Sequence, residues 1–122
     1  MNRPLIIGLA AVPAAALALA GAASGGVHAA RATRHLSADP NGDFSFTRKR
    51  LSAPPGRVTL VMKNPSSSGL PHGIAIKGRK GKTVNPGGTS RVTVTLKRGT
   101  YTYYCPVPGH RSFGMKGRIR IG

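Results

Sequence analysis

The chain has 122 residues, with 17 Gly, 10 Pro and a single Cys, a length that suits one compact domain. It carries 19 Lys and Arg against only two carboxylates, Asp39 and Asp43, which gives a formal net charge of +17. One cysteine excludes an internal disulfide and an iron–sulfur cluster, and two carboxylates leave little room for acid–base catalysis.

The N-terminus has the pattern of an export signal. Met1-Asn2-Arg3 is a short basic start, the apolar Ala-rich run extends from Leu5 to about Ala23, and small residues follow, with cleavage expected at Val27-His28-Ala29. We therefore interpret residues 1–29 as a signal peptide, with an uncleaved membrane anchor as the alternative. This predicts a protein of the periplasm, cell surface or extracellular space.

The next residues lack a strong pattern until the first aromatic pair. Residues 30–41 are polar, and we expect a flexible N-terminal segment there, followed by one domain over residues 42–122. Phe44–Thr47 is predicted as the first strand. The turn at Pro54-Pro55-Gly56 leads to a second predicted strand over 57–64, in which Val58, Leu60 and Met62 share one face.

Four further strands are expected in the second half of the chain. They cover residues 72–77, 91–96, 100–105 and 116–121, and Gly- or Pro-containing turns separate them. The clearest is 91–96, where Val92, Val94 and Leu96 alternate with polar residues. The pattern predicts an all-β fold, an antiparallel Greek-key β-sandwich of about seven or eight strands.

The chemistry of the sequence is concentrated between the last two predicted strands. Cys105, His110 and Met115 follow one another at intervals of five residues, and His72 opens a strand further upstream. A thiolate, two imidazoles and a thioether form the soft donor set typical of a mononuclear copper site. Zinc sites rarely use Met, and a binuclear copper centre would need a second bridging Cys. Taken singly, each residue also has a plain structural explanation, Cys105 as a small buried residue and Met115 as a core filler.

These motifs resemble the cupredoxin superfamily, the plastocyanin- and azurin-like type 1 blue copper proteins. The resemblance rests on Pro71-His72, the aromatic strand that ends at Tyr104-Cys105, the Cys-x4-His-x4-Met loop and the closing strand. The loop spacing is most similar to that of rusticyanin, auracyanin and sulfocyanin. The resemblance implies one copper ion held by His72, Cys105 and His110 as equatorial ligands and by Met115 as the axial ligand. His28 and His35 lie outside this pattern and are not expected to be ligands.

The resemblance also implies a surface for electron transfer. In the family, the C-terminal His ligand reaches the surface within an apolar docking patch, and a Tyr before the Cys offers a second route. Here these are His110 and Tyr104. Gly73 departs from the family, in which a polar side chain often supports the site. The implied docking patch consists of Leu70, Pro71, Val107, Pro108 and Phe113.

We therefore expect an electron carrier and not an enzyme, cycling one copper ion between Cu²⁺ and Cu⁺. Its basic surface favours transient binding of an acidic redox protein and association with an anionic membrane surface, while no nucleic-acid partner is expected. A monomer is expected. Two alternatives remain open, a copper storage or delivery protein and a cationic envelope protein that binds polyanions and has a degenerate copper site.

Overall fold

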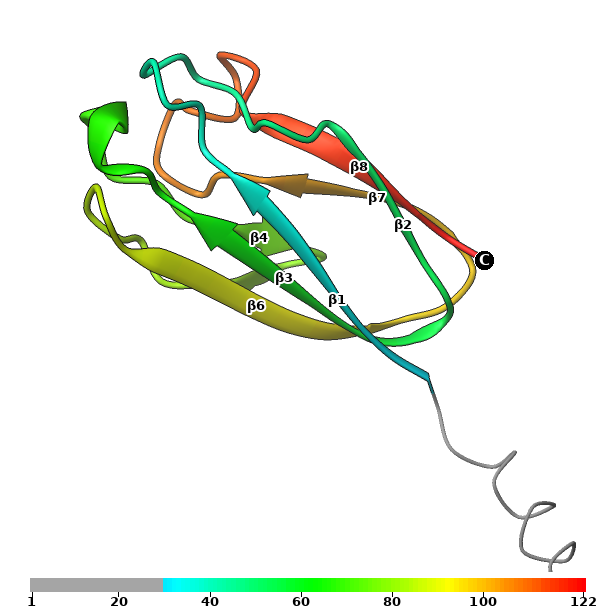
Figure 1. Cartoon of the computed structure of the whole chain (residues 1–122). Helices are drawn as coiled ribbons and strands as arrows, with labels where there is room; N and C mark the ends of the chain where they lie inside the picture. Colours follow the sequence, from blue (N-terminus) through cyan, green and yellow to red (C-terminus); the bar gives the residue numbers. More distant parts are fainter. Residues whose placement is uncertain (1–29) are drawn as a thin grey trace, which may run out of the picture.

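A computed structural model of the chain describes residues 30–122, and the expected signal segment lies outside the described residues (Figure 1). Apart from one short 3-10 turn, the regular secondary structure of the described part consists of strands. Among these residues, no helix has the length and apolar character needed to cross a membrane. In chain order the elements are β1 (Ala30–Ser37), β2 (Arg50–Ala53), β3 (Gly56–Lys63), η1 (Ser66–Ser68), β4 (Ala75–Ile76), β5 (Arg79–Lys80), β6 (Thr89–Leu96), β7 (Gly99–Tyr104) and β8 (Lys116–Ile121).

The strands form two sheets, in the orders β1-β3-β6 and β2-β8-β7-β4-β5 (Figure 1). The predicted all-β fold class is therefore confirmed. The expectation of purely antiparallel pairing is wrong, because β1 pairs with β3 and β2 pairs with β8 in parallel. Parallel neighbours need a long connection, and the chain supplies one by sending the segment between β1 and β3 across to the other sheet as β2.

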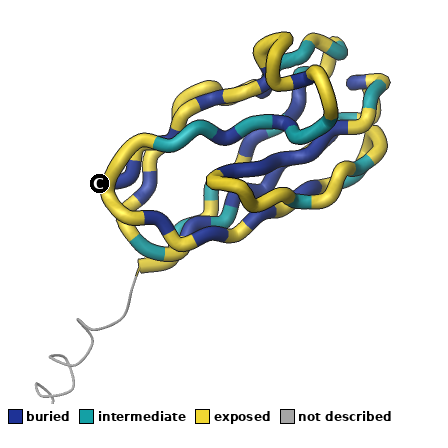
Figure 2. The backbone as a smooth tube through the Cα atoms, turned by 180° about the vertical axis from the view of Figure 1, so that it is seen from behind, coloured by how far each residue is buried: buried dark blue, intermediate teal, exposed yellow. Residues whose placement is uncertain are grey.

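The core lies between the two sheets and draws its buried residues from strands of both. Figure 2 shows the buried stretches of the backbone in dark blue. The predicted inward face of β3 is confirmed, since Val58, Leu60 and Met62 are all fully buried. Strand β6 alternates exposed and buried residues along its whole length. This period of two leaves one face of each sheet in the core and the other in solvent.

The expectation of a flexible segment at 30–41 is wrong for its first eight residues. Ala30–Ser37 forms β1 and pairs residue by residue with β3, from Ala30↔Gly56 to Ser37↔Lys63. The reason is that backbone hydrogen bonds hold an edge strand whose outer side chains are polar, so the segment shows little apolar pattern. Leu36 is the one deeply buried residue of β1, Ala38 just after it is also buried, and the domain therefore begins before residue 42.

One expected strand does not form and another is shorter than predicted. Phe44–Thr47 is a loop with a single bridge between Ala38 and Phe46, although the Phe46 side chain is buried. Within 72–77 only Ala75–Ile76 is strand, because His72 instead forms an isolated bridge with Val84. Both departures occur at the end of the sandwich where the connection between β7 and β8 also lies (Figure 1).

Candidate metal centre

Three of the predicted ligands meet at this end of the sandwich. His72 Nδ1 lies 3.2 Å from His110 Nδ1, and Cys105 Sγ lies 3.9 and 3.6 Å from these two atoms. All three residues are buried, with His110 the most exposed at 9%. Residues that are far apart in the sequence therefore point their donor atoms at one common position.

The loop between β7 and β8 brings Cys105, His110 and Met115 together through its own backbone. Cys105 N donates to Met115 O, and Met115 N donates to His110 O, both at 3.1 Å. Gly109 and Gly114 have φ of 87° and 114°, so the loop turns sharply where glycine tolerates the left-handed region. Met115, the fourth predicted ligand, is fully buried at the root of the loop.

His72 is positioned by a buried amide that the sequence analysis did not identify. Asn64 Nδ2 donates to Leu70 O at 2.9 Å and to Val84 O at 3.0 Å, and its Oδ1 accepts from Ser68 Oγ at 2.5 Å. Val84 O also accepts from His72 N, so one carbonyl joins the Asn64 side chain to the backbone of His72. Asn64 follows β3 directly, and only its complete burial distinguishes it from an ordinary turn residue.

Burial determines the protonation of the donors. Desolvation lowers the pKa of His72, with the neighbouring His110 as a second cause, and desolvation also lowers the pKa of His110. Burial raises the pKa of the Cys105 thiol, opposed by backbone N–H groups of Gly73 and Val107. The lowered pKa of each imidazole favours the neutral form that binds a cation, whereas the raised pKa of the thiol favours the protonated form, whose proton a bound metal ion would displace.

These contacts fit a metal ion better than a protein-only interaction. Two imidazole Nδ1 atoms face each other and the Cys105 sulfur, with no other side chain among residues 30–122 hydrogen-bonded to these three atoms. A soft cation between the Nδ1 atoms and Sγ would account for an arrangement that the surrounding side chains do not explain, and the donor set suits copper.

Gly73 supports the centre through its backbone, although the sequence offered no side chain there. Its N–H points at Cys105 Sγ over 3.5 Å. A Cβ at this position would approach Lys82 O to 3.1 Å and the Pro106 ring to 3.4 Å. The small residue therefore allows the segment of His72 and Gly73 to lie close to Cys105 and Pro106.

Aromatic rings cover the side of His110 that faces solvent. Phe44 lies with its ring centroid 4.8 Å from that of His110 and stacks on Phe113 at 5.0 Å. Phe113 is 70% exposed, and no other large apolar side chain among residues 30–122 is comparably exposed to solvent. Phe44 was expected in a strand, and its contact with a residue 66 positions later left no local signal in the sequence.

The residues of the predicted docking patch are accessible around this aromatic cover. Pro71 and Pro108 are exposed, and Leu70 and Val107 are half-buried. Tyr104 is also half-buried, and the Arg111 guanidinium stacks over its ring at 4.1 Å. Tyr104 therefore reaches the surface in part, whereas His110 is nearly buried and lies beneath the aromatic cover.

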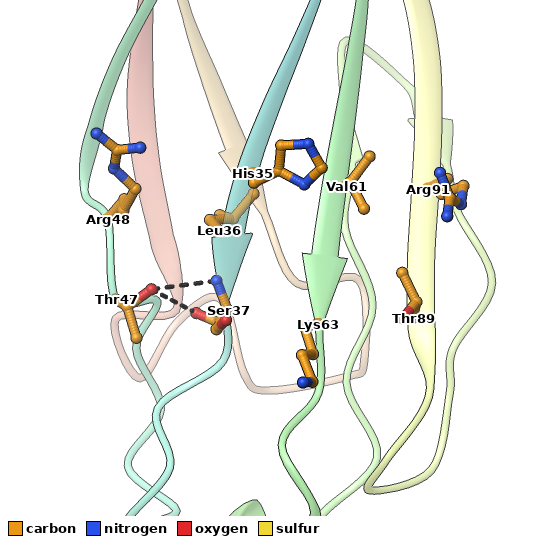
Figure 3. A pocket seen from close by; sticks show the side chains of 9 residues that line it. All are labelled: His35, Leu36, Ser37, Thr47, Arg48, Val61, Lys63, Thr89 and Arg91. Carbon is orange, nitrogen blue, oxygen red and sulfur yellow. Dashed lines mark hydrogen bonds between the residues drawn. The ribbon is translucent and has the colours of Figure 1, made fainter.

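A separate hollow lies away from the metal centre. A hollow of about 430 Å³ on the outer face of the three-stranded sheet is lined by His35, Val61 and Arg91 among others, and contains none of the four predicted ligands (Figure 3). His35 is exposed on β1 and separate from the donor cluster. His28 lies outside the described residues.

Comparison with known protein families agrees with this geometry. The sequence profile of the copper binding proteins, plastocyanin/azurin family, matches residues 32–122. The chain belongs to this family. Its centre, with two His and one Cys gathered around one position and Met115 buried beside them, is that of a protein with one copper ion as cofactor. The match begins within β1, in agreement with a domain that starts before residue 42.

Solved structures share the family fold with this chain. Auracyanin from Roseiflexus castenholzii is 24% identical, with a TM-score of 0.66 over 74% of this chain and 96% of its own. Auracyanin A from Chloroflexus aurantiacus is 22% identical, with a TM-score of 0.64 over 76% and 100%. Copper nitrite reductase from Nitrosomonas europaea is 19% identical, with a TM-score of 0.63 over 75% of this chain and 41% of its own. A search of curated protein sequences found no match.

Proposed function

We propose that this protein carries single electrons between redox partners, with His72, Cys105 and His110 as equatorial copper ligands and Met115 as the axial ligand. The observation that carries the proposal is the convergence of His72 Nδ1, His110 Nδ1 and Cys105 Sγ within 4.8 Å of one another. Copper in such a site supplies reversible one-electron chemistry. The chain's part is to hold these donors in one arrangement, which it does through the Asn64 hydrogen bonds and the backbone closure at Met115.

Catalysis is not supported by the surroundings of the centre. The two carboxylates, Asp39 and Asp43, lie on the loop after β1, and Asp39 accepts hydrogen bonds from Asn41 N and Ser45 Oγ. No carboxylate belongs to the donor cluster among residues 30–122. A general acid or base for substrate chemistry is therefore missing from the described centre, which favours a carrier over an enzyme.

The copper proposal is tested by adding Cu²⁺ to the protein and recording its visible spectrum. We expect one equivalent to bind with an intense blue band, because a thiolate ligand gives strong visible absorption that nitrogen and oxygen ligands lack. Cys105→Ser should abolish this band. A blue band that survives in Cys105→Ser would contradict the ligand assignment.

Met115 can be tested against a matched residue, since Met62 is also fully buried but lies in β3. Met115→Leu should shift the reduction potential while the blue band persists, because the axial bond is weak. Met62→Leu should leave the potential unchanged. Equal shifts in the two variants would argue against an axial role for Met115.

Storage or delivery of copper is the second candidate function. The buried donors and the closed loop favour retention of the ion, which suits a carrier of electrons better than a donor of metal. Repeated reduction and oxidation at one potential without copper loss would support the carrier. Loss of copper to a weak chelator on each reduction would favour delivery.

We also propose that an acidic redox protein docks over His110 at the patch of Leu70, Pro71, Val107, Pro108 and Phe113. The aromatic cover makes this the apolar part of a surface that is otherwise basic, and redox partners use small, transient interfaces. The net charge of +17 would steer such a partner. The electron-transfer rate should fall as salt rises, and a flat dependence would refute steering.

The proposed place of action is outside the cytoplasm, after cleavage of residues 1–29 at Val27-His28-Ala29. The basic start and the apolar run of the sequence support this. Mass spectrometry of the protein recovered from an expressing bacterial cell should find an N-terminus at Ala30. Recovery of the full-length chain from the membrane fraction would favour the anchor instead.

A further inference from the structure

A row of basic hollows runs along β8, on a face that the proposed copper function does not use. One hollow of about 330 Å³ lies beside the copper loop, a second of about 360 Å³ follows, and a third of about 230 Å³ lies at the far end. The first two share Arg50, and the last two share Arg120. The three hollows therefore adjoin in a line.

The strand pairing explains the linear order of these charges. Lys116, Arg118 and Arg120 occupy alternate positions of β8 and are all exposed, so they project from one face about 7 Å apart. Arg50 of β2 pairs directly with Arg118. Arg98 lines the last hollow. We call these five residues the cationic stripe.

No acidic side chain of the described residues lines the three hollows. Asp39 and Asp43 both lie on the loop after β1. Hydroxyl groups of Thr100 and Thr102 line the same hollows, and they can donate to an anion. Closely spaced like charges repel one another, so an anion that binds several at once would stabilise this face.

We propose that the cationic stripe binds a linear phosphodiester polymer of the cell envelope. Guanidinium groups match phosphate in charge and geometry, and four of the five stripe residues are Arg. A row of adjoining hollows fits a chain along its length, whereas a lipid surface would need a plane. This inference does not depend on the copper function.

The aromatic residues near the stripe argue against single-stranded nucleic acid as the occupant. Nucleic-acid grooves of this kind stack bases on open aromatic rings. Here the Tyr104 ring is covered by Arg111, and Lys77 lies 5.7 Å above the Tyr101 ring. The face therefore offers charges and hydroxyls for a backbone but no free ring for a base.

The test measures binding of the copper-loaded protein to a poly(glycerol phosphate) chain at several salt concentrations. The stripe variant is the triple substitution Arg50→Gln, Arg118→Gln and Arg120→Gln. We expect it to bind at least about 10-fold more weakly, with the slope of log K against log salt reduced by about 2, by analogy with the loss of three contacts to a single-stranded polyanion.

A charge-matched control is available on the outer face of the other sheet. Arg57→Gln, Lys63→Gln and Arg91→Gln remove the same three charges from exposed positions of β3 and β6, two of which are seen in Figure 3. We expect this control to bind the polymer within about 3-fold of the unchanged protein, since only diffuse attraction is lost. The blue band shows whether each triple variant is folded. If either triple variant is not folded, the single substitutions Arg118→Gln and Arg91→Gln are compared in its place.

The possible outcomes distinguish between the ligands that the cationic stripe could bind. Equal weakening in stripe and control variants would overturn the proposal in favour of diffuse charge. Tighter binding to phosphatidylglycerol vesicles, to a single-stranded oligodeoxynucleotide or to a sulfated oligosaccharide than to poly(glycerol phosphate) would overturn the assigned polymer. Weaker polymer binding in the stripe variant but not in the control variant, with the blue band intact, would support the proposal. Loss of the copper site alone should leave polymer binding unchanged.

Discussion

Replacement of Asn64 by Ala should destabilise the protein through the loop that carries His72. The side chain makes three hydrogen bonds, two donated to Leu70 O and Val84 O and one accepted from Ser68 Oγ. Each is worth about 1 kcal/mol net, so the free energy of unfolding should fall by about 3 kcal/mol. For a domain of this size, that corresponds to a drop of roughly 15 °C in Tm.

The structure also predicts where this loss is felt. Val84 O would keep its bond from His72 N but lose the bond from the Asn64 amide, so the segment that carries His72 should loosen more than the distant strands. Thermal unfolding followed by circular dichroism measures the stability, and copper titration measures the affinity. We expect both to fall in Asn64→Ala.

Asn85→Ala is the matched control, because Asn85 is exposed in a neighbouring turn and its side chain makes no hydrogen bond within residues 30–122. Its Tm should change by less than about 3 °C, the effect of a surface substitution of under 0.5 kcal/mol. If Asn64→Ala lowered the stability by under about 1 kcal/mol, or no more than Asn85→Ala, the buried amide would not be the element that holds His72 in place.

Three further predictions concern the core and the surface. Burial raises the pKa of Tyr103 to about 12, so its contribution to stability is present below pH 10 and is lost as pH rises through 12. Urea unfolding at pH 9 and 11.5 measures this loss of stability, which should be about 2 to 3 kcal/mol smaller in Tyr103→Phe than in the unchanged protein, although the variant also lacks the hydrogen bond to Arg48 O. The same pH dependence in both proteins would contradict this. Gly117→Ala should cost about 1 to 3 kcal/mol in the same assay, because its Cβ would collide with the Tyr103 ring, and a neutral result would be evidence against the close packing. Phe113→Ser should leave Tm and the blue band unchanged yet slow electron transfer to a partner, and an unaltered rate would exclude Phe113 from the docking patch.

The connection between β7 and β8 illustrates how much of the centre could be predicted from sequence. The spacing of Cys105, His110 and Met115 is local, and the flanking glycines and prolines predict a tight loop. His72 could be added only by resemblance to a family, because nothing in its own neighbourhood marks it as a ligand. The strands over 91–96 and 116–121 could also be predicted from the sequence, because a strand with one buried and one exposed face alternates between two kinds of residue.

The tertiary structure decided the features that depend on partners distant along the chain. β1 is a strand because β3 offers it backbone hydrogen bonds, although its own residues predict none. Asn64 contacts the Val84 carbonyl and Phe44 contacts the His110 imidazole, and only folding brings these groups together. Lys116, Arg118 and Arg120 already alternate in the sequence, but only the pairing of β2 with β8 places Arg50 beside them.

By itself, then, the sequence determined the fold class, the cysteine-containing loop and the soft donor set, because periodicity and ligand spacing are properties of neighbouring residues. Only the tertiary structure decided which segment forms the edge strand, which amide holds His72 and how the positive charge is distributed. Those features arise from hydrogen bonds and packing between residues far apart in the chain, and such contacts leave no local pattern to read.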